Sequence, residues 1–161
     1  GTELLLGQIV DTHAPTMGRI LAECGIGCRR RTTVGDNFDR LVETLRESLS
    51  RADVVIAIGG LGPTGDDLTR EAIAAALDEG LVKEPEVERA LRDWFASRNY
   101  AFAESNAKQA MRPESAELID NPNGTAPGLV VRKNGKLVIA LPGPKGEFDP
   151  MATGPVREIL A

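Results

Sequence analysis

The stretch VVIAIGGLGPTGDDLTREAIAAAL, residues 54–77, is the part of the sequence that decides the fold class. It opens with a short apolar run, residues 54–58, of the kind that forms a central strand covered on both faces. The alanine-rich residues 66–79 predict a helix. Between strand and helix the chain holds four glycines and then two carboxylates: Gly59, Gly60, Gly62, Gly65, Asp66 and Asp67. A strand, a glycine-rich turn and a helix in this order indicate one unit of an α/β fold.

The rest of the chain continues the alternation of helices and strands. A strand is expected over residues 26–35, and Asn134-Gly135 between two apolar runs predicts a β-hairpin. Further helices are expected within residues 12–25, 36–52, 85–98 and 104–112, and in a last segment that begins at Pro155. We therefore expect one domain over residues 1–161. It should be a three-layer α/β/α sandwich whose mostly parallel sheet carries an antiparallel hairpin strand.

Composition is typical of a soluble globular domain of ordinary size. The 161 residues carry a formal net charge of −5 and a sequence pI of about 5.0, which argues against a broad nucleic-acid or anionic-membrane surface. The basic run Arg29-Arg30-Arg31 is expected to be an edge strand or a solvated face. Cys24 and Cys28 are expected to be buried or half-buried free thiols, and no apolar run reaches 18 residues. These features predict a cytoplasmic protein with a small-molecule ligand and no nucleic-acid or membrane partner.

The glycine turn allows three interpretations. A dinucleotide-binding fingerprint requires a second strand and an acidic residue about 20 positions on, yet only Leu81-Val82 follow Glu79 before a charged segment. A Walker phosphate loop requires Gly-Lys-Ser or Gly-Lys-Thr where the acidic pair stands. In a capping box, Thr64 and Asp67 would satisfy the amides at the helix start. Capping does not explain four glycines, which permit positive φ and close backbone approach, so a ligand site is expected in addition.

The acidic pair predicts how an anionic ligand binds at this turn. Free N–H groups at a helix start hold phosphate oxygens. Asp66 or Asp67 would hold a divalent cation that neutralises the same phosphates, because Mg²⁺ typically uses one or two carboxylates together with substrate phosphates. The spacing leaves open which aspartate ligates the metal and which orients water or caps the helix.

Five segments, in matching order, resemble the N-terminal domain of the competence-damage-inducible protein CinA. They are GTELLLGQIVDT (1–12), RTTVGDN (31–37), IAIGGLGPTGDDLTRE (56–71), NPNGTAPGL (121–129) and LPGPKGEF (141–148). That domain belongs to the molybdopterin-binding superfamily, beside MogA, MoaB and MoeA. The resemblance implies an α/β/α domain with a mainly parallel sheet. It also implies that a first strand before Gly1 is missing, and nothing matches the C-terminal nicotinamide-mononucleotide deamidase domain of longer CinA proteins.

The resemblance further assigns roles to residues around one ligand pocket. Asp67 first, and then Asp66, would act in catalysis. A divalent metal (Mg²⁺, Mn²⁺ or Co²⁺) would be bound by Asp66, Asp67, Glu3 and Glu147. The residues expected to bind substrate are Gly59, Gly60, Gly62, Thr64, Asp36, Gly124, Thr125, Pro142, Gly143 and Lys145. His13 stands where the family usually has Asn; it is either a ligand-binding or a packing residue, and packing is the commoner role of such a histidine.

By resemblance, the expected function is metal-dependent hydrolysis of the pyrophosphate bond in ADP-ribose or a similar nucleotide. The alternative is a module that binds molybdopterin or the molybdenum cofactor, with or without adenylyl transfer and without hydrolase activity. A third interpretation is an interaction domain that kept the pocket but lost its chemistry. In the first two cases the ligand bears phosphate. The resemblance also implies a homo-oligomer, for which residues 80–113 are a candidate contact.

Overall fold

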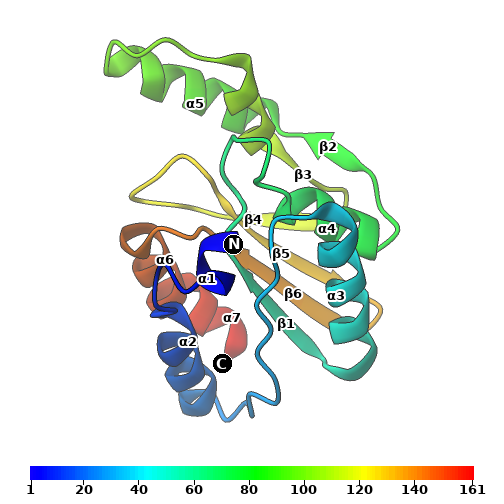
Figure 1. Cartoon of the computed structure of the whole chain (residues 1–161). Coiled ribbons are helices and arrows are strands. Elements are labelled where there is room, and N and C mark those ends of the chain that lie inside the picture. Colours follow the sequence, from blue (N-terminus) through cyan, green and yellow to red (C-terminus); the bar gives the residue numbers. More distant parts are fainter.

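The central sheet of the computed structural model, which describes all of residues 1–161, has the strand order β1-β6-β5-β4 (Figure 1). β1 and β6 are parallel, whereas β6-β5 and β5-β4 are antiparallel. The strand bounds are β1 Val54–Ile58, β4 Ala116–Ile119, β5 Gly128–Lys133 and β6 Lys136–Leu141. The α/β class is confirmed, but the sheet is mixed rather than mostly parallel, because consecutive strands joined by short loops pair antiparallel.

Helices cover both faces of this sheet and make the three layers that were expected (Figure 1). α2, α6 and α7 pack on one face, and α3 and α4 on the other. Alternate side chains of β6 point to opposite faces of the sheet. Ile139 packs in the core shared with α2, α6 and α7, and Val138 packs in the core shared with α3 and α4. The helix bounds are α1 Thr2–Leu5, α2 His13–Glu23, α3 Phe38–Arg51, α4 Thr69–Ala76, α5 Pro85–Ser97, α6 Lys145–Met151 and α7 Arg157–Leu160. None of the helices combines the length and the apolar character needed to cross a lipid bilayer.

Local sequence signals account for several of these boundaries. Asn37 caps α3, where its side-chain oxygen accepts a hydrogen bond from the backbone N–H of Arg40 at 3.1 Å. Pro85 occupies the first turn of α5, where a backbone N–H would have no partner within the helix. Asn134 and Gly135 have φ values of 52° and 73°, and two positive values are what a tight hairpin turn requires. The predicted hairpin is therefore confirmed.

Three predicted elements differ from the structure. Residues 26–35 are extended but pair with no strand, so the strand predicted there is wrong: β1 has β6 on one edge only, and a segment without a neighbouring strand forms no ladder. The helix predicted over residues 66–79 begins only at Thr69, because residues 64–67 form a separate turn. A 3₁₀ helix, η1 (Glu104–Ala110), replaces the α-helix expected there and leads into a short strand.

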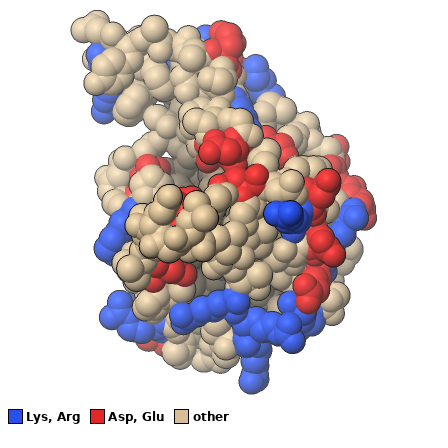
Figure 2. All heavy atoms as spheres, viewed as in Figure 1, with Lys and Arg blue, Asp and Glu red and all other residues tan.

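Charged side chains of both signs are scattered in patches over the visible face of the molecule (Figure 2). Lys and Arg gather at the lower edge of this view, beside the segment that joins α2 to α3. That segment carries Arg29, Arg30 and Arg31, which are all exposed and belong to no strand. The basic run is therefore a solvated face, one of the two predicted alternatives.

Residues 81–113 form an arm that projects beyond the end of the sheet (Figure 1). At its base β2 (Leu81–Lys83) pairs antiparallel with β3 (Met111–Pro113) in a separate two-stranded sheet, and α5 and η1 lie between them in the chain. A strand does follow Glu79, contrary to our prediction, but it is not a neighbour of β1 and forms no dinucleotide-binding unit. Most aromatic side chains of the protein form a cluster of their own on the arm: Trp94, Phe95, Tyr100 and Phe102. Local contacts thus hold the arm together.

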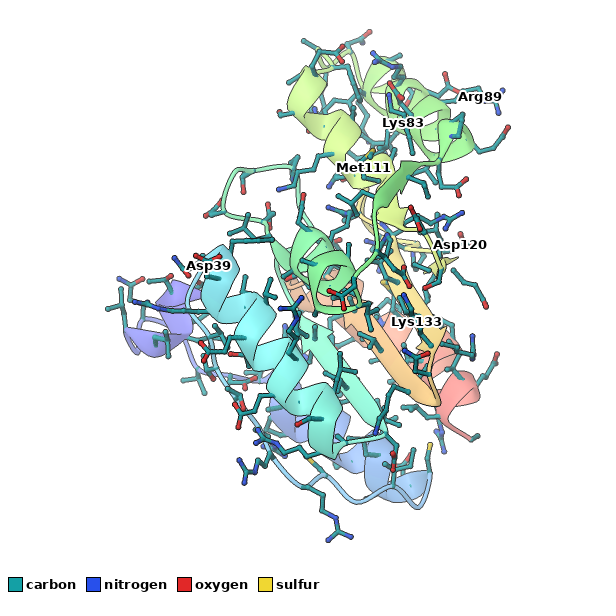
Figure 3. The ribbon with its side chains drawn as sticks, turned by 90° about the vertical axis from the view of Figure 1, so that its right-hand side faces the viewer. Asp39, Lys83, Arg89, Met111, Asp120 and Lys133 are labelled. Carbon is teal, nitrogen blue, oxygen red and sulfur yellow. The ribbon has the colours of Figure 1, made fainter.

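A buried carboxylate links the end of α4 to the β5–β6 hairpin. Glu79 accepts hydrogen bonds from Ser115 N at 3.0 Å and Ser115 Oγ at 2.6 Å, and its Oε1 lies 2.7 Å from Lys133 Nζ. Lys133, labelled in Figure 3, also donates to the carbonyl oxygen of Leu77. Burial raises the pKa of the Glu79 carboxyl, but the hydrogen bonds from Lys133 and Ser115 outweigh burial and hold the pKa below its usual value.

Replacing Glu79 by glutamine is expected to lower the free energy of unfolding at pH 7 by about 2 kcal/mol, because the charged hydrogen bond to Lys133 is lost. Since the folded-state pKa of Glu79 is lowered, its stabilisation is full above about pH 4.3 and is lost as the pH falls through the folded-state value. Urea unfolding at pH 7 and at pH 3 measures both effects. Glu117→Gln, whose carboxylate is 73% exposed, is the control and should change stability by less than about 0.5 kcal/mol. An equal loss for Glu79→Gln at both pH values would contradict this assignment.

Candidate functional site

Three loops meet at one end of the sheet. The N–H of Gly59 donates to the carbonyl oxygen of Leu141 at 2.8 Å, so the turn after β1 starts beside the end of β6. The turn after β6 lies against it, since a Cβ atom on Gly143 would be 3.5 Å from Gly59 Cα. The loop before β5 lies at the same end, because Leu129 pairs with Ala140 near the end of β6. Open α/β sheets bind ligands at the carboxyl ends of their parallel strands. The structure thus brings together the loops that carry most of the predicted substrate-binding residues.

Three glycines of the turn are explained by backbone conformation or by close side chains of the protein itself. Gly59 and Gly60 have φ values of +96° and +70°, which residues with a side chain rarely adopt. A Cβ atom on Gly60 would collide with Oγ1 of Thr69. A Cβ atom on Gly62 would lie 2.5 Å from Oδ2 of Asp67. The groups that approach Gly60 and Gly62 in the structure are Thr69 and Asp67, and the ligand expected at these glycines stays a prediction.

Thr64 holds the two aspartates of the turn. Oδ2 of Asp67 accepts hydrogen bonds from Thr64 N at 3.0 Å and from Thr64 Oγ1 at 2.6 Å, and Oδ1 of Asp66 is a second acceptor for the hydroxyl. These contacts resemble half of the predicted capping box, but they cap no helix, because α4 starts at Thr69. The Thr64 hydroxyl and the backbone N–H of Asp66 hold the pKa of the Asp66 carboxyl below its usual value.

Arg70 places a buried positive charge at the start of α4, beneath the turn. Its side chain is fully buried; Nη2 donates to the carbonyl oxygen of Leu61 at 2.9 Å, while Nε and Nη1 have no partner. Burial lowers the pKa of the guanidinium, and the carboxylates of Glu71 and Asp67 oppose that effect. Through its hydrogen bond to the carbonyl oxygen of Leu61, Arg70 holds the middle of the glycine turn in place. Sequence reasoning missed it, and the available signal was a basic residue one helical turn after the acidic pair.

Lys108, which sequence reasoning also missed, reaches the turn from the arm. Its Nζ donates to the carbonyl oxygen of Thr64 at 3.1 Å and to that of Asp67, and it lies 3.4 Å from the carboxylate of Glu71. The only signal in the sequence is the polar run SNAKQA, residues 105–110, directly before β3. Nothing in that run indicates contact with a turn some 40 residues earlier in the chain.

His13 braces the turn that follows β6. Its Nε2 lies 2.5 Å from the carbonyl oxygen of Gly143, which can only accept, so this nitrogen carries the proton. The ring stacks on Phe148, with centroids 4.2 Å apart and planes at 25°. Pro142, next to Gly143, is buried. His13 therefore has the packing role considered for it, and its Nδ1 is buried without a hydrogen-bond partner.

The loop before β5 is held by Asn121 and Glu147. Nδ2 of Asn121 donates to Oε2 of Glu147 at 2.6 Å and to the carbonyl oxygen of Ala126 at 2.9 Å. A Cβ atom on Gly124 would collide with the Glu147 carboxylate, which explains the glycine. Thr125 is half-buried in the same loop. Glu147 thus orients the loop, and Asn121 is a site residue that our prediction did not include.

Three predicted site residues have other partners or none. Asp36 accepts hydrogen bonds from Thr2 N at 2.9 Å and Thr2 Oγ1 at 3.0 Å. Lys145 pairs with Asp149 of its own helix at 2.7 Å. Glu3 is exposed on α1, and its side chain makes no hydrogen bond. None of the three hydrogen bonds to the glycine turn, so their roles in ligand binding stay predictions.

The four carboxylates predicted to bind a metal do not form one cluster. No three His, Cys, Asp or Glu side chains in the protein converge on a point that a metal ion could occupy. Glu147 is engaged with Asn121, and Glu3 lies on α1. Asp66 and Asp67 nevertheless keep one carboxylate oxygen each without a hydrogen-bond partner, Oδ2 and Oδ1 respectively. Carboxylate oxygens of this kind are the ligands that Mg²⁺ uses, one or two from the protein together with phosphate and water oxygens.

The three-layer α/β/α domain, with a glycine turn and an acidic pair at one end of its sheet, has the architecture of a known class of proteins. A model of the family described as "Probable molybdopterin binding domain" matches residues 1–161. A molybdopterin biosynthesis protein from Mycobacterium abscessus has a similar fold, with a TM-score of 0.59, 20% identity, and coverage of 98% of this chain and 88% of that one.

Proteins with higher sequence identity to this chain show to which group within the family it belongs. A CinA-like protein from Deinococcus radiodurans is 49% identical over 155 residues, and one from Kosmotoga olearia is 47% identical over 151 residues; each match covers 94% of this chain. The matches span 38% and 37% of those proteins. The crystal structure of the protein CinA with unknown function from Thermoplasma acidophilum gives a TM-score of 0.88 at 34% identity, over 100% of this chain and 95% of that one. This chain therefore belongs to the molybdopterin-binding domain family, in its CinA-like group.

Proposed function

We propose that this domain binds a small phosphate-bearing ligand of the molybdopterin class at the turn between β1 and α4. The observation that carries the proposal is the position of Asp66 and Asp67, whose free carboxylate oxygens stand beside the glycine turn at the carboxyl ends of β1 and β6. Membership in the molybdopterin-binding family supports the ligand class.

In this proposal a divalent cation is held by Asp66 and Asp67. Bound there, Mg²⁺, Mn²⁺ or Co²⁺ would neutralise the phosphate charge of the ligand. Thr64 keeps both carboxylates in place through its N–H and hydroxyl. The turn at Gly143, braced by His13, forms the opposite wall. In this proposal the protein therefore positions the two carboxylates that hold the cation and provides a preformed glycine turn for the ligand.

Hydrolysis of ADP-ribose or a related pyrophosphate is the second candidate. The observation that favours it is that Thr64 holds two adjacent carboxylates, those of Asp66 and Asp67, beside the glycine turn. One of the pair could hold the cation while the other, Asp67 first, orients or deprotonates the attacking water. Positioning and electrostatics would then supply most of the rate.

Calorimetric titration distinguishes these functions. The protein is titrated with molybdopterin and with ADP-ribose, each with Mg²⁺, Mn²⁺ or Co²⁺ and each with EDTA. We expect binding of molybdopterin that requires the cation. Chromatography of the ADP-ribose samples detects AMP if the domain is a hydrolase. Binding of equal strength in EDTA would contradict the role given to the aspartates, and absence of binding to both ligands would reject the proposal.

Replacing Gly62 by alanine is expected to weaken ligand binding about 10-fold, because its Cβ atom would lie 2.5 Å from Asp67 Oδ2 and displace that carboxylate from Thr64. Gly65→Ala is the matched control: it lies in the same turn, its Cβ atom would meet nothing within 4 Å, and Kd should stay within about two-fold. Titration measures both, and thermal unfolding shows that both variants fold. Equal Kd values for the two variants would show that the placement of Asp67 does not govern binding.

A further inference from the structure

We propose that Lys108 is a positioning residue that holds the acidic turn, Thr64–Asp67, against the arm and so sets how the turn presents its carboxylates. Its effect on ligand binding rests on the proposed function. Its effect on the turn itself does not, and can be measured on the protein without ligand.

The turn has few connections to the rest of the molecule. The N–H of Asp67 donates to the carbonyl oxygen of Thr64 at 3.3 Å, and the N–H and hydroxyl of Thr64 donate to Asp67 Oδ2. These bonds lie within the turn. The hydrogen bonds that reach it from outside come from Lys108, whose Nζ donates to both carbonyl oxygens, at the first and at the last residue of the turn. One ammonium group therefore bridges the two ends of the turn.

Lys108 is well placed to act in this way. Its side chain is 22% exposed, and its Nζ also lies 3.4 Å from the carboxylate of Glu71 on α4. The neighbouring Gln109 and Ala110 are buried, 3% and 2% exposed, so the end of η1 that carries Lys108 is held in place by packing. Hydrogen bonds from a charged donor at a partly buried position are stronger than those between neutral groups.

A simple ion pair with Glu71 is the competing explanation of this contact. In that case the ammonium group of Lys108 would link α4 to the arm, and its removal would not change the conformation of the turn. The two explanations differ in what happens when only Glu71 is changed. Glu71→Gln removes the ion pair but leaves both carbonyl contacts of Lys108 in place.

NMR hydrogen exchange of the Thr64 and Asp67 amides tests the proposal without ligand. Lys108→Met keeps the length of the side chain but removes the ammonium, and both amides should exchange about 10-fold faster than in the unchanged protein. Lys108→Arg should restore most of the protection, and Glu71→Gln should leave it within about two-fold. Lys83→Met is the control for loss of a lysine on the arm. Lys83 pairs with Glu88 at 2.5 Å and lies on the arm itself (Figure 3).

Unchanged exchange in Lys108→Met would overturn the proposal, as would an equal increase in Glu71→Gln. If Lys108→Met does not fold, the comparison of Lys108→Arg with Glu71→Gln decides: protection kept in both supports the carbonyl contacts, and protection lost in Glu71→Gln rejects them. Titration with inorganic pyrophosphate and Mg²⁺ then measures the effect on the site, and Kd should rise about 10-fold in Lys108→Met. If the unchanged protein binds neither pyrophosphate nor molybdopterin nor ADP-ribose, the proposed function fails while the exchange result still decides the role of Lys108.

Discussion

Replacing Phe148 by alanine is expected to lower the free energy of unfolding by about 4 kcal/mol. The ring is fully buried in the core between the sheet and helices α2, α6 and α7. Its removal leaves a cavity that the surrounding residues can fill only in part. It also removes the surface on which His13 stacks, and His13 holds the carbonyl oxygen of Gly143 at the site. Loss of the Phe148 ring is therefore expected both to lower the stability of the protein and to disturb the turn at Gly143.

Urea unfolding measures the Phe148→Ala effect, and Phe38→Ala is the matched control. Phe38 begins α3 and is 40% exposed, so its replacement should change stability by less than about 1 kcal/mol. If Phe148→Ala does not fold, Phe148→Leu should fold with a loss of about 1.5 kcal/mol. Equal losses for Phe148→Ala and Phe38→Ala would contradict the packing described for this core.

Replacing Asp67 by asparagine is expected to weaken cation-dependent ligand binding about 100-fold. The amide oxygen of asparagine can still accept the hydrogen bonds from Thr64, so the turn should keep its shape while it loses one of two negative charges. If the domain hydrolyses ADP-ribose, turnover should fall by about the same factor, because the same carboxylate would orient the water.

Titration in Mg²⁺ and in EDTA, with AMP release where it occurs, checks the Asp67→Asn effect. Asp39→Asn is the control, since it makes the same change of net charge on α3, where Asp39 is exposed (Figure 3). Unchanged affinity or turnover in Asp67→Asn would contradict the assignment of the acidic pair to the ligand site. It would also contradict the role proposed for the cation.

Much of the fold could be predicted because its signals are local. Asn37 caps α3, Pro85 starts α5 and Asn134-Gly135 turns the hairpin, each through a conformational preference of the residue itself. The failures are non-local. Residues 26–35 have the composition of a strand, but a strand exists only where another one lies beside it, and none does. The short strand β2 was missed because its partner, β3, comes almost 30 residues later.

By itself the sequence determined the three-layer class, the family and the turn that carries the acidic pair, because glycines with positive φ and adjacent carboxylates leave a pattern in consecutive residues. Only the tertiary structure decided which groups surround that turn. Lys108 from the arm and Arg70 from inside α4 reach it, and His13 contacts the neighbouring turn at Gly143, through contacts between segments far apart in the chain or through burial. No residue spacing in the sequence encodes such contacts. They form only when the packed layers bring the ends of different strands and helices next to one another.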